Sequence, residues 1–209
     1  MSLVPSHVAR EPATWRLRRD AQSRDSTRLS RAHQSSRAAA HFWCIAPDSD
    51  FVVKKKSLSL PALSATLVPA QAGDELELDE MWSWVYRRIN KRWLWLALCR
   101  RTRQIVPYAI GCRGEATCSV LWQRIPAAYK SSLCYSDFWA AYTQVVPATQ
   151  HNRSQGRGKT NHIERYNNTI RQRVGRLVRQ TLSFSKSDFM HEATIKIFIH
   201  HYNQSKIPT

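Results

Sequence analysis

The chain has 209 residues, enough for one domain of ordinary size with a tail, and its 43% hydrophobic content allows a packed core. Its formal net charge of +17 favours nucleic acid as the partner, because no apolar stretch is long enough to cross a membrane. A merely basic protein that binds no nucleic acid is the alternative that the charge leaves open.

Cysteine spacing argues against a zinc site. The five cysteines form no C-x-x-C pair, which is the usual spacing of cysteine zinc ligands. Cys99, Cys112 and Cys134 lie in or beside apolar runs and are predicted to be small buried hydrophobic residues. Since neither a disulfide framework nor a signal peptide is evident, we expect a reducing, cytosolic setting.

Residues 1–53 differ from the rest of the chain, because they are rich in Arg, Ser and Ala and poor in bulky apolar residues. Such a segment buries too little surface to offset the entropy of ordering, so we expect a disordered basic arm. The arm could tether DNA without sequence preference, or it could be an extension with no selected structure. Residues 54–74, which include Pro61 and Pro69, are predicted to be a linker.

Three strands are predicted to form a meander, at residues 76–86, 93–99 and 105–111. In the first strand Leu76 and Leu78 share one parity and Asp79 has the other, so Asp79 should face away from the leucines. The second is a continuous apolar run, as is typical of a buried strand. Pro107 indicates that the third strand has an edge position or a bulge.

Helices and one short strand follow. Helices are expected at residues 115–125, 161–179 and 186–202, with a helical turn at 138–142 and a polar loop at 147–159. A strand at residues 132–136 ends at Asp137. The order strand, strand, strand, helix, strand, helix predicts an α/β fold over residues 75–205, a ribonuclease H-like mixed sheet flanked by helices.

Three carboxylates, Asp79, Asp137 and Glu164, form the candidate catalytic and metal-binding set. Mg²⁺ prefers hard oxygen ligands and usually takes one or two carboxylates per ion. Two such ions, about 3.5–4 Å apart, clamp the attacking and leaving oxygens of a phosphoryl transfer. Two strand ends and the start of a crossing helix can converge, so these carboxylates could hold such a pair.

The helix predicted from residue 161 separates apolar, acidic and basic side chains. Its buried stripe is expected to be Ile163, Tyr166, Ile170, Val174 and Leu177. Glu164 lies off that stripe, on a face with Asn168, Arg171 and Gly175. Cations on and beside the helix are the candidate DNA contacts, because they can neutralise phosphates: Lys159, Arg165, Arg171, Arg173, Arg176 and Arg179.

Each acidic residue has an alternative structural role. The functional carboxylate of the first strand could be Glu80, which is adjacent to Asp79. Asp137 could cap the helical turn that follows it. Glu164 could form an ion pair with Arg165 or Arg171. Three histidines are interpreted as DNA contacts or polar core groups and not as zinc ligands, namely His151, His162 and His191.

Several sequence blocks resemble the motifs of the bacterial insertion-element-one family of transposases, InsB type. The segment LELDEMWS at residues 76–83 is similar to the family's first-aspartate motif, and YSDFWAAY at 135–142 is similar to its second. The third motif is resembled by GKT at 158–160, IERYN at 163–167 and RQR at 171–173. The segment RLVRQTLSFSKS at residues 176–187 resembles the signature that follows the third motif in this family, and His191 stands at the matching position.

This resemblance, which runs from about residue 54 to residue 202, implies a DDE transposase. Such enzymes cut element ends with water and then join the freed 3′-hydroxyl to target DNA, with Mg²⁺, or Mn²⁺, as cofactor. The resemblance implies Asp79, Asp137 and Glu164 as metal ligands. It also implies double-stranded DNA as partner, a homo-oligomer on DNA, no membrane association, and a bacterial cytoplasmic, nucleoid-associated location.

The sequence departs from the family at its front end. Complete family enzymes carry an N-terminal zinc finger and a helix-turn-helix, and residues 1–53 have no C-x-x-C pair and no helix-turn-helix pattern. Recognition of element ends by this chain alone is therefore in question. Two alternatives to a transposase stay open, a catalytically silent DNA-binding remnant and a ribonuclease H-like nuclease.

Overall fold

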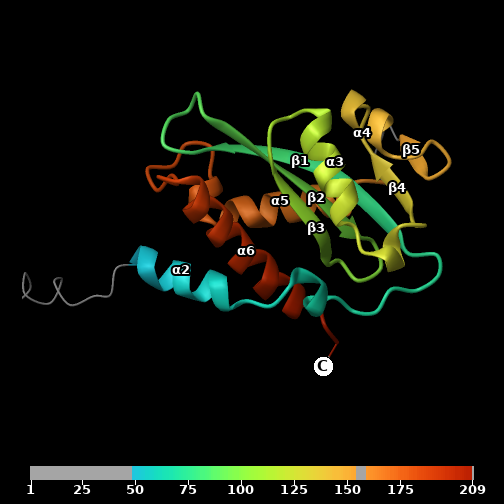
Figure 1. The fold of residues 1–209 in the computed structure, drawn as a ribbon, viewed down its shortest axis with the longest axis horizontal. Helices are drawn as coiled ribbons and strands as arrows, with labels where there is room; N and C mark the ends of the chain where they lie inside the picture. Colours follow the sequence, from blue (N-terminus) through green and yellow to red (C-terminus); the bar gives the residue numbers. More distant parts are fainter. Residues whose placement is uncertain (1–48, 154–158, 209) are drawn as a thin grey trace, which may run out of the picture. The chain divides into compact units, whose positions relative to one another are not determined.

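The structure is a computed structural model that describes residues 49–153 and 159–208. The basic arm predicted for residues 1–53 lies almost entirely outside the described residues. Within them the chain forms an α/β fold with one five-stranded mixed sheet (Figure 1). The prediction of a mixed sheet flanked by helices is confirmed.

The sheet has the strand order β3-β2-β1-β4-β5. Its first three strands form the predicted antiparallel meander, β1 (Glu75–Trp84), β2 (Lys91–Cys99) and β3 (Ile105–Gly111). Two short strands, β4 (Leu133–Ser136) and β5 (His151–Arg153), extend the sheet in parallel. Pro107 lies on the edge strand β3, at a register shift opposite residues 96–98, so both expectations for this proline are confirmed.

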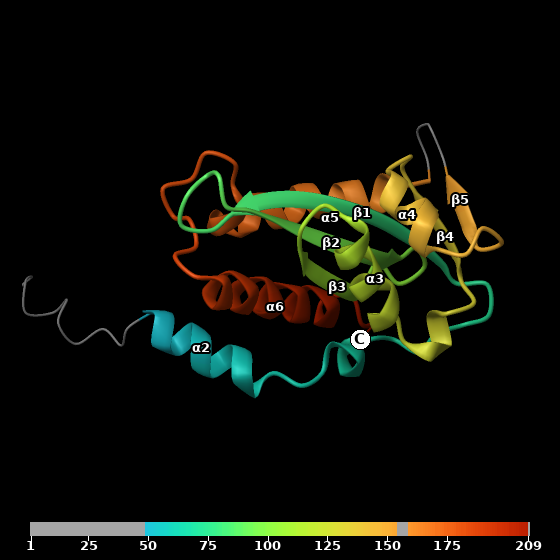
Figure 2. The same ribbon diagram turned by 45° about the horizontal axis from the view of Figure 1, so that its top comes forward.

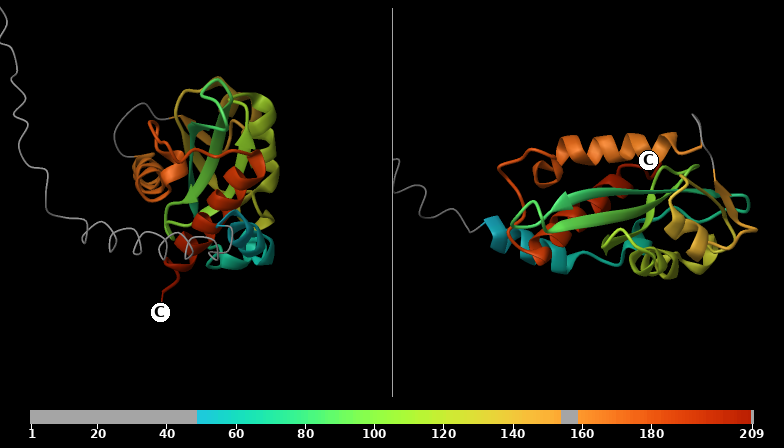
Figure 3. Two further views of the ribbon diagram at one scale, coloured as in Figure 1. Left: turned by 90° about the vertical axis from the view of Figure 1, so that its left-hand side faces the viewer. Right: turned by 90° about the horizontal axis from the view of Figure 1, so that it is seen from above.

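Helices cover both faces of the sheet (Figures 2 and 3). On one face lie α3 (Glu115–Arg124), the 3₁₀ turn η2 (Ala127–Tyr129) and α4 (Ala140–Val145). On the other face lie α5 (Asn161–Arg173), the 3₁₀ turn η3 (Gly175–Leu177) and α6 (Asp188–Gln204). Among the described residues no helix combines the length and the apolar character needed to cross a bilayer.

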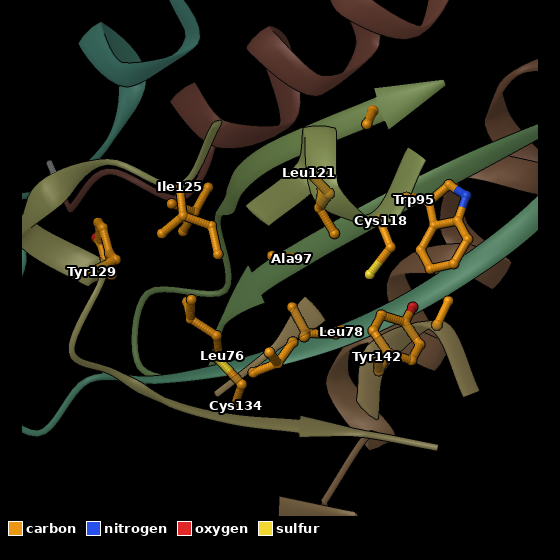
Figure 4. Close-up of a cluster of buried hydrophobic side chains, with 14 of the residues drawn as sticks. Leu76, Leu78, Trp95, Ala97, Cys118, Leu121, Ile125, Tyr129, Cys134 and Tyr142 are labelled. Carbon is orange, nitrogen blue, oxygen red and sulfur yellow. The ribbon is translucent and has the colours of Figure 1, made fainter. Parts of the chain in front are cut away.

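Strand alternation divides the core into two clusters. Leu76 and Leu78 of β1 pack with Cys118 and Leu121 of α3 and with Tyr142 of α4 (Figure 4). The second cluster joins the opposite face of the sheet to α5 and α6, and its buried members include Met81, Leu94, Leu96, Ile163, Ile170 and Ile195. The central strands are therefore covered on both sides, which accounts for the continuous apolar run of β2.

Residues 54–68 are more structured than the linker interpretation anticipated. Helix α2 (Ser49–Ser59) packs along α6, and Lys196 Nζ donates a 3.0 Å hydrogen bond to the Ser57 carbonyl. The 3₁₀ turn η1 (Leu63–Thr66) follows, and Gln104 Nε2 donates to the Thr66 carbonyl. Tertiary bonds order this segment although its own sequence has weak helical periodicity.

Three local predictions were wrong. Helix α5 ends at Arg173 and not near residue 179, because Val174 takes an extended conformation and Gly175, a poor helix former, follows it. The polar loop at residues 147–159 contains strand β5, which has no apolar alternation and is held by pairing with β4. Cys112 is exposed, whereas Cys99 and Cys134 are buried as expected.

Candidate active site

Asp79 lies on the central strand β1, on the face that α5 covers. Its Oδ2 accepts a 2.7 Å hydrogen bond from Asn167 Nδ2 of α5, and its Oδ1 accepts from the Glu80 amide at 2.8 Å. Leu76 and Leu78 pack on the opposite face of the sheet. The geometry thus directs this carboxylate toward the helix that carries Glu164.

The electrostatics of Asp79 report other acidic groups nearby. Burial, together with the charges of Glu80, Asp137 and Glu164, raises the pKa of Asp79 to about 7. The hydrogen bond from the Glu80 amide opposes this rise. Both distant candidates, Asp137 and Glu164, therefore lie close enough to Asp79 to repel its negative charge.

Asp137 follows β4, which pairs in parallel with β1. The paired residues include Glu77 and Tyr135, so extending this register by two residues brings Asp137 level with Asp79 on neighbouring strands. The Asp137 side chain is exposed, and its Oδ1 accepts a 2.9 Å hydrogen bond from the Trp139 amide. That bond shapes the turn before α4 and leaves the other carboxylate oxygen without a hydrogen bond among the described residues.

Glu164 lies in the first turn of α5 and is exposed. Its Oε1 accepts a 2.8 Å hydrogen bond from Thr160 Oγ1. Neither of the ion pairs considered as alternatives forms among the described residues. Arg171 instead extends toward two backbone carbonyls, those of Leu177 and Trp82, each at 3.4 Å.

Glu77 fixes the position of α5, although the sequence did not identify it as a site residue. Its side chain is fully buried, and Oε2 accepts hydrogen bonds from the amides of His162 and Ile163, each at 2.9 Å. Its Oε1 accepts from Arg100 Nε at 2.9 Å. A carboxylate at a helix N-terminus is favourable for both its hydrogen bonds and its charge. Glu77 and Asp79 together tie β1 to α5, so the start of the helix and Glu164 are held in place.

Glu80 lies on the opposite face of β1 from Asp79. Its Oε1 accepts from Arg113 Nε and Nη2, and its Oε2 accepts from the Tyr142 hydroxyl at 2.9 Å. The Arg113 guanidinium lies over the rings of Trp93 and Trp139. Both carboxylates accept hydrogen bonds at both oxygens, but Asp79 lies on the face of β1 that α5 covers, so it is the carboxylate of this pair that faces the helix carrying Glu164.

The three candidate carboxylates have the ligand chemistry that a hard divalent cation prefers, but they are not arranged as a complete coordination site. All three candidate side chains offer carboxylate oxygens, which Mg²⁺ and Mn²⁺ prefer. A bound cation would also offset the repulsion between carboxylates that, after burial, contributes to the raised pKa of Asp79. Across residues 49–153 and 159–208, no three acidic, histidine or cysteine side chains stand grouped at metal-binding spacing. Binding therefore requires the carboxylates to draw closer.

The three histidines considered as DNA contacts or core groups have polar partners within the protein. His191 is buried between two hydroxyls, with Nε2 at 3.0 Å from Ser83 Oγ and Nδ1 at 3.0 Å from Ser185 Oγ. It is a polar core group, one of the two roles expected. His151 Nε2 lies 2.7 Å from Ser136 Oγ, and His162 Nε2 lies 3.9 Å from Glu77 Oε1.

The candidate DNA contacts fall into two groups. Arg165, Arg173, Arg179 and Lys159 are exposed, and Lys159 Nζ lies 4.8 Å from the centre of the Tyr135 ring. Arg171 and Arg176 are partly buried instead. Arg176 Nη2 lies 3.3 Å from Asp50 Oδ1 of α2, so part of its charge is neutralised within the protein.

Asn167 and Glu77 were missed as site residues, although the sequence held a signal for Glu77. It stands between two leucines in a strand that reads as buried, where an ionised residue requires a specific partner. Asn167 belongs to the third sequence block, but nothing in that block indicates that its amide would reach Asp79.

Comparison with known proteins assigns a family. The profile of the IS1 transposase family matches residues 75–204. The chain is 37% identical over 123 residues to the iso-IS1n protein InsB of Shigella dysenteriae, a match that covers 59% of this chain and 92% of that protein. It is 34% identical over 128 residues to the IS1 protein InsB of Shigella flexneri, which covers 60% and 95%. It is 30% identical over 162 residues to the IS1 9 protein InsB of Escherichia coli K12, which covers 75% and 93%. The chain therefore belongs to the IS1 transposase family, whose members are DNA transposases.

Proposed function

We propose that the chain cuts and joins DNA by metal-dependent phosphoryl transfer at Asp79, Asp137 and Glu164. The observation that carries this proposal is the placement of the three carboxylates: the register of β4 against β1 brings Asp137 level with Asp79, and Asn167 ties Asp79 to the helix that carries Glu164. Carboxylates with a perturbed pKa are enriched at functional sites. The sheet order and the helices on both faces support a ribonuclease H-like fold as the scaffold.

Each site residue has a distinct part in this proposal. Asp79 supplies carboxylate oxygens from the rigid central strand, and Asp137 supplies them from the neighbouring strand end. Glu164 approaches from α5, whose N-terminus Glu77 holds through two amides. When bound, Mg²⁺ or Mn²⁺ supplies Lewis-acid activation of the attacking oxygen and stabilisation of the leaving oxygen.

The amides at the start of α5 are unsuited to contact a phosphate, because those of His162 and Ile163 already donate to Glu77. Lys159 is exposed beside them and is the better candidate to meet a phosphate at this end of the helix. In this proposal the substrate is double-stranded DNA. A homo-oligomer would allow two element ends to be cut together.

The test is strand cleavage and strand transfer on a supercoiled plasmid that carries the DNA flanking the coding sequence. The full chain should cut and join only with Mg²⁺ or Mn²⁺, and Asp137→Asn, an isosteric change at an exposed residue, should abolish both steps. Equal activity of the variant would refute the assignment. Salt-sensitive binding without cleavage under either metal would identify a DNA-binding remnant. Preferential cleavage of RNA–DNA hybrids would identify a ribonuclease H-like nuclease.

A further inference from the structure

A cavity of about 350 Å³ lies along α5, bounded by the turn between β2 and β3 and by the C-terminal end of α6. Leu98 and Tyr166 contribute to its apolar lining. Its polar lining residues include Arg103, Arg165 and Arg173. Both helices lie on the same face of the sheet, as Figure 2 shows.

The lining of this cavity is strongly cationic. Arg103, Arg165, Arg173 and Lys206 line it together with His162, and no acidic residue does. None of the three arginines or Lys206 forms an ion pair with another described residue. Burial lowers the pKa of His162, the charge of Glu77 opposes this shift, and the charges of Arg103, Arg100 and Arg165 add to it. The cations therefore act on a common region, where an anion would be favoured.

Two buried polar atoms at this cavity have no hydrogen-bond partner among the described residues. They are Nη1 of Arg103 and the hydroxyl of Tyr166, whose side chain is only 1% exposed. Unsatisfied buried donors are rare, because a buried polar group without a hydrogen bond is unfavourable. Arg103 also adopts a φ of 62°, a left-handed conformation that is uncommon for a residue with a side chain. The turn between β2 and β3 thus adopts an uncommon backbone conformation at Arg103, a residue that lines the cavity.

The cationic cavity lies on a different flank of α5 from Glu164. At 3.6 residues per turn, Arg173 is rotated by roughly 180° from Glu164 around the helix axis. Arg165, Thr169 and Arg173 follow one another at intervals of four residues and all line the cavity. One helix therefore presents its acid on one side and a row of cations on the other.

We propose that this cavity binds backbone phosphates of a DNA segment other than the one that is cut. The proposal rests on the proposed function and assigns a second DNA contact to the same helix. Arginine forks match phosphate oxygens. From Arg165 to Arg173 the row runs about 12 Å along the helix. One strand of duplex DNA presents a phosphate about every 3.4 Å of its axis. The row is therefore long enough for more than one phosphate, which favours a polymer over a single free phosphate ion.

The experiment measures the affinity of the full chain for a fluorescent DNA duplex of arbitrary sequence as salt is raised, with EDTA present. The variant Arg165→Gln/Arg173→Gln removes two cavity cations from exposed positions. The matched control, Arg87→Gln/Arg88→Gln, removes two exposed arginines from the turn between β1 and β2. Urea unfolding of all variants verifies that each is folded.

The slope of log affinity against log salt should decrease in magnitude by about 0.9 for each phosphate that the protein no longer neutralises. We expect a decrease of roughly one to two in the cavity variant and no decrease in the control. Arg165→Lys/Arg173→Lys should retain most of the slope, since it keeps the charges. Equal slopes for the cavity variant and the control would overturn the proposal.

A second arm distinguishes DNA from free phosphate, with inorganic phosphate as competitor at constant ionic strength. The proposal expects weak competition, whereas tight phosphate binding combined with an unchanged DNA slope in the cavity variant would overturn it. Glu164→Gln separates this proposal from the proposed function, because it should abolish cleavage and leave the slope as in the wild type. If the slopes of the wild type and the cavity variant differ but the wild type cleaves no DNA, the proposed function alone is refuted.

Discussion

Replacing Asp79 by asparagine should stabilise the folded chain at pH 8 while it removes a proposed metal ligand. The folded protein holds the pKa of Asp79 near 7, against an ordinary value of 3.8. The unfolded chain therefore releases this proton first, and the free energy of unfolding falls as pH rises from about 4 to about 7. Asparagine carries no charge, so the variant avoids this penalty.

The magnitude follows from the pKa difference. About three pH units between folded and unfolded pKa values correspond to about 4 kcal/mol at pH 8. Asparagine can accept the Glu80 amide bond, but it loses one of the two acceptor oxygens, which costs about 1 kcal/mol. Asn167 can rotate its side-chain amide so that its unpartnered Oδ1 accepts from the new residue. The expected net gain is about 3 kcal/mol at pH 8 and near zero or slightly negative at pH 4.

Urea unfolding at pH 4 and pH 8 in EDTA measures this difference. Asp74→Asn is the matched control, because Arg101 holds the pKa of Asp74 below its ordinary value. The control should destabilise the protein at pH 8, which is the opposite sign. Added Mg²⁺ should stabilise the wild type and leave Asp79→Asn unchanged. A destabilised Asp79→Asn at pH 8, or a difference that does not change with pH, would refute the reasoning.

Three further predictions concern the support of the site and the core. Glu77→Gln should lower the free energy of unfolding by about 2–3 kcal/mol and weaken Mg²⁺ binding, because it removes the charge that holds the α5 amides. Chemical denaturation measures the stability and calorimetry measures the metal affinity. An unchanged metal affinity would contradict the anchoring role of Glu77. Burial lowers the pKa of His191 to about 4, so stability should fall by about 3 kcal/mol as pH drops from 6.5 to 4. In His191→Gln that component of the pH dependence should be absent, and its persistence would count against the assignment. Asn203→Ala should lower the free energy of unfolding by about 2–4 kcal/mol, because the buried Asn203 side chain hydrogen-bonds to the amide and the carbonyl of Ile105. A decrease below about 1 kcal/mol would show that these bonds contribute little.

Much of the sheet could be predicted because alternation and apolar runs are local signals. The parity of Leu76 and Leu78 against Asp79 placed the carboxylate on the correct face of β1. The buried stripe through Ile163 and Ile170 likewise placed one face of α5 against the core. In both elements the side-chain period alone decides which residues meet the core.

The features that the sequence did not predict depend on contacts between segments that are distant in the chain. Strand β5 is polar and is held by its pairing with β4, so its own residues give no signal. Helix α2 packs along α6, more than a hundred residues away in the chain. The role of Glu77 required knowing where α5 begins in space, and the cationic cavity required the turn at Arg103 to meet the end of α6.

Iron-mediated cleavage of the polypeptide tests the central claim most directly. Fe²⁺ replaces Mg²⁺ in oxygen-ligand sites, and with ascorbate and peroxide it produces radicals that cut the nearby backbone. The proposal that Asp79, Asp137 and Glu164 hold one metal centre predicts three cuts, near these residues, that excess Mg²⁺ suppresses together and that Glu164→Gln weakens at all three positions. Cuts confined to one of these segments, or located elsewhere in the chain, would contradict it.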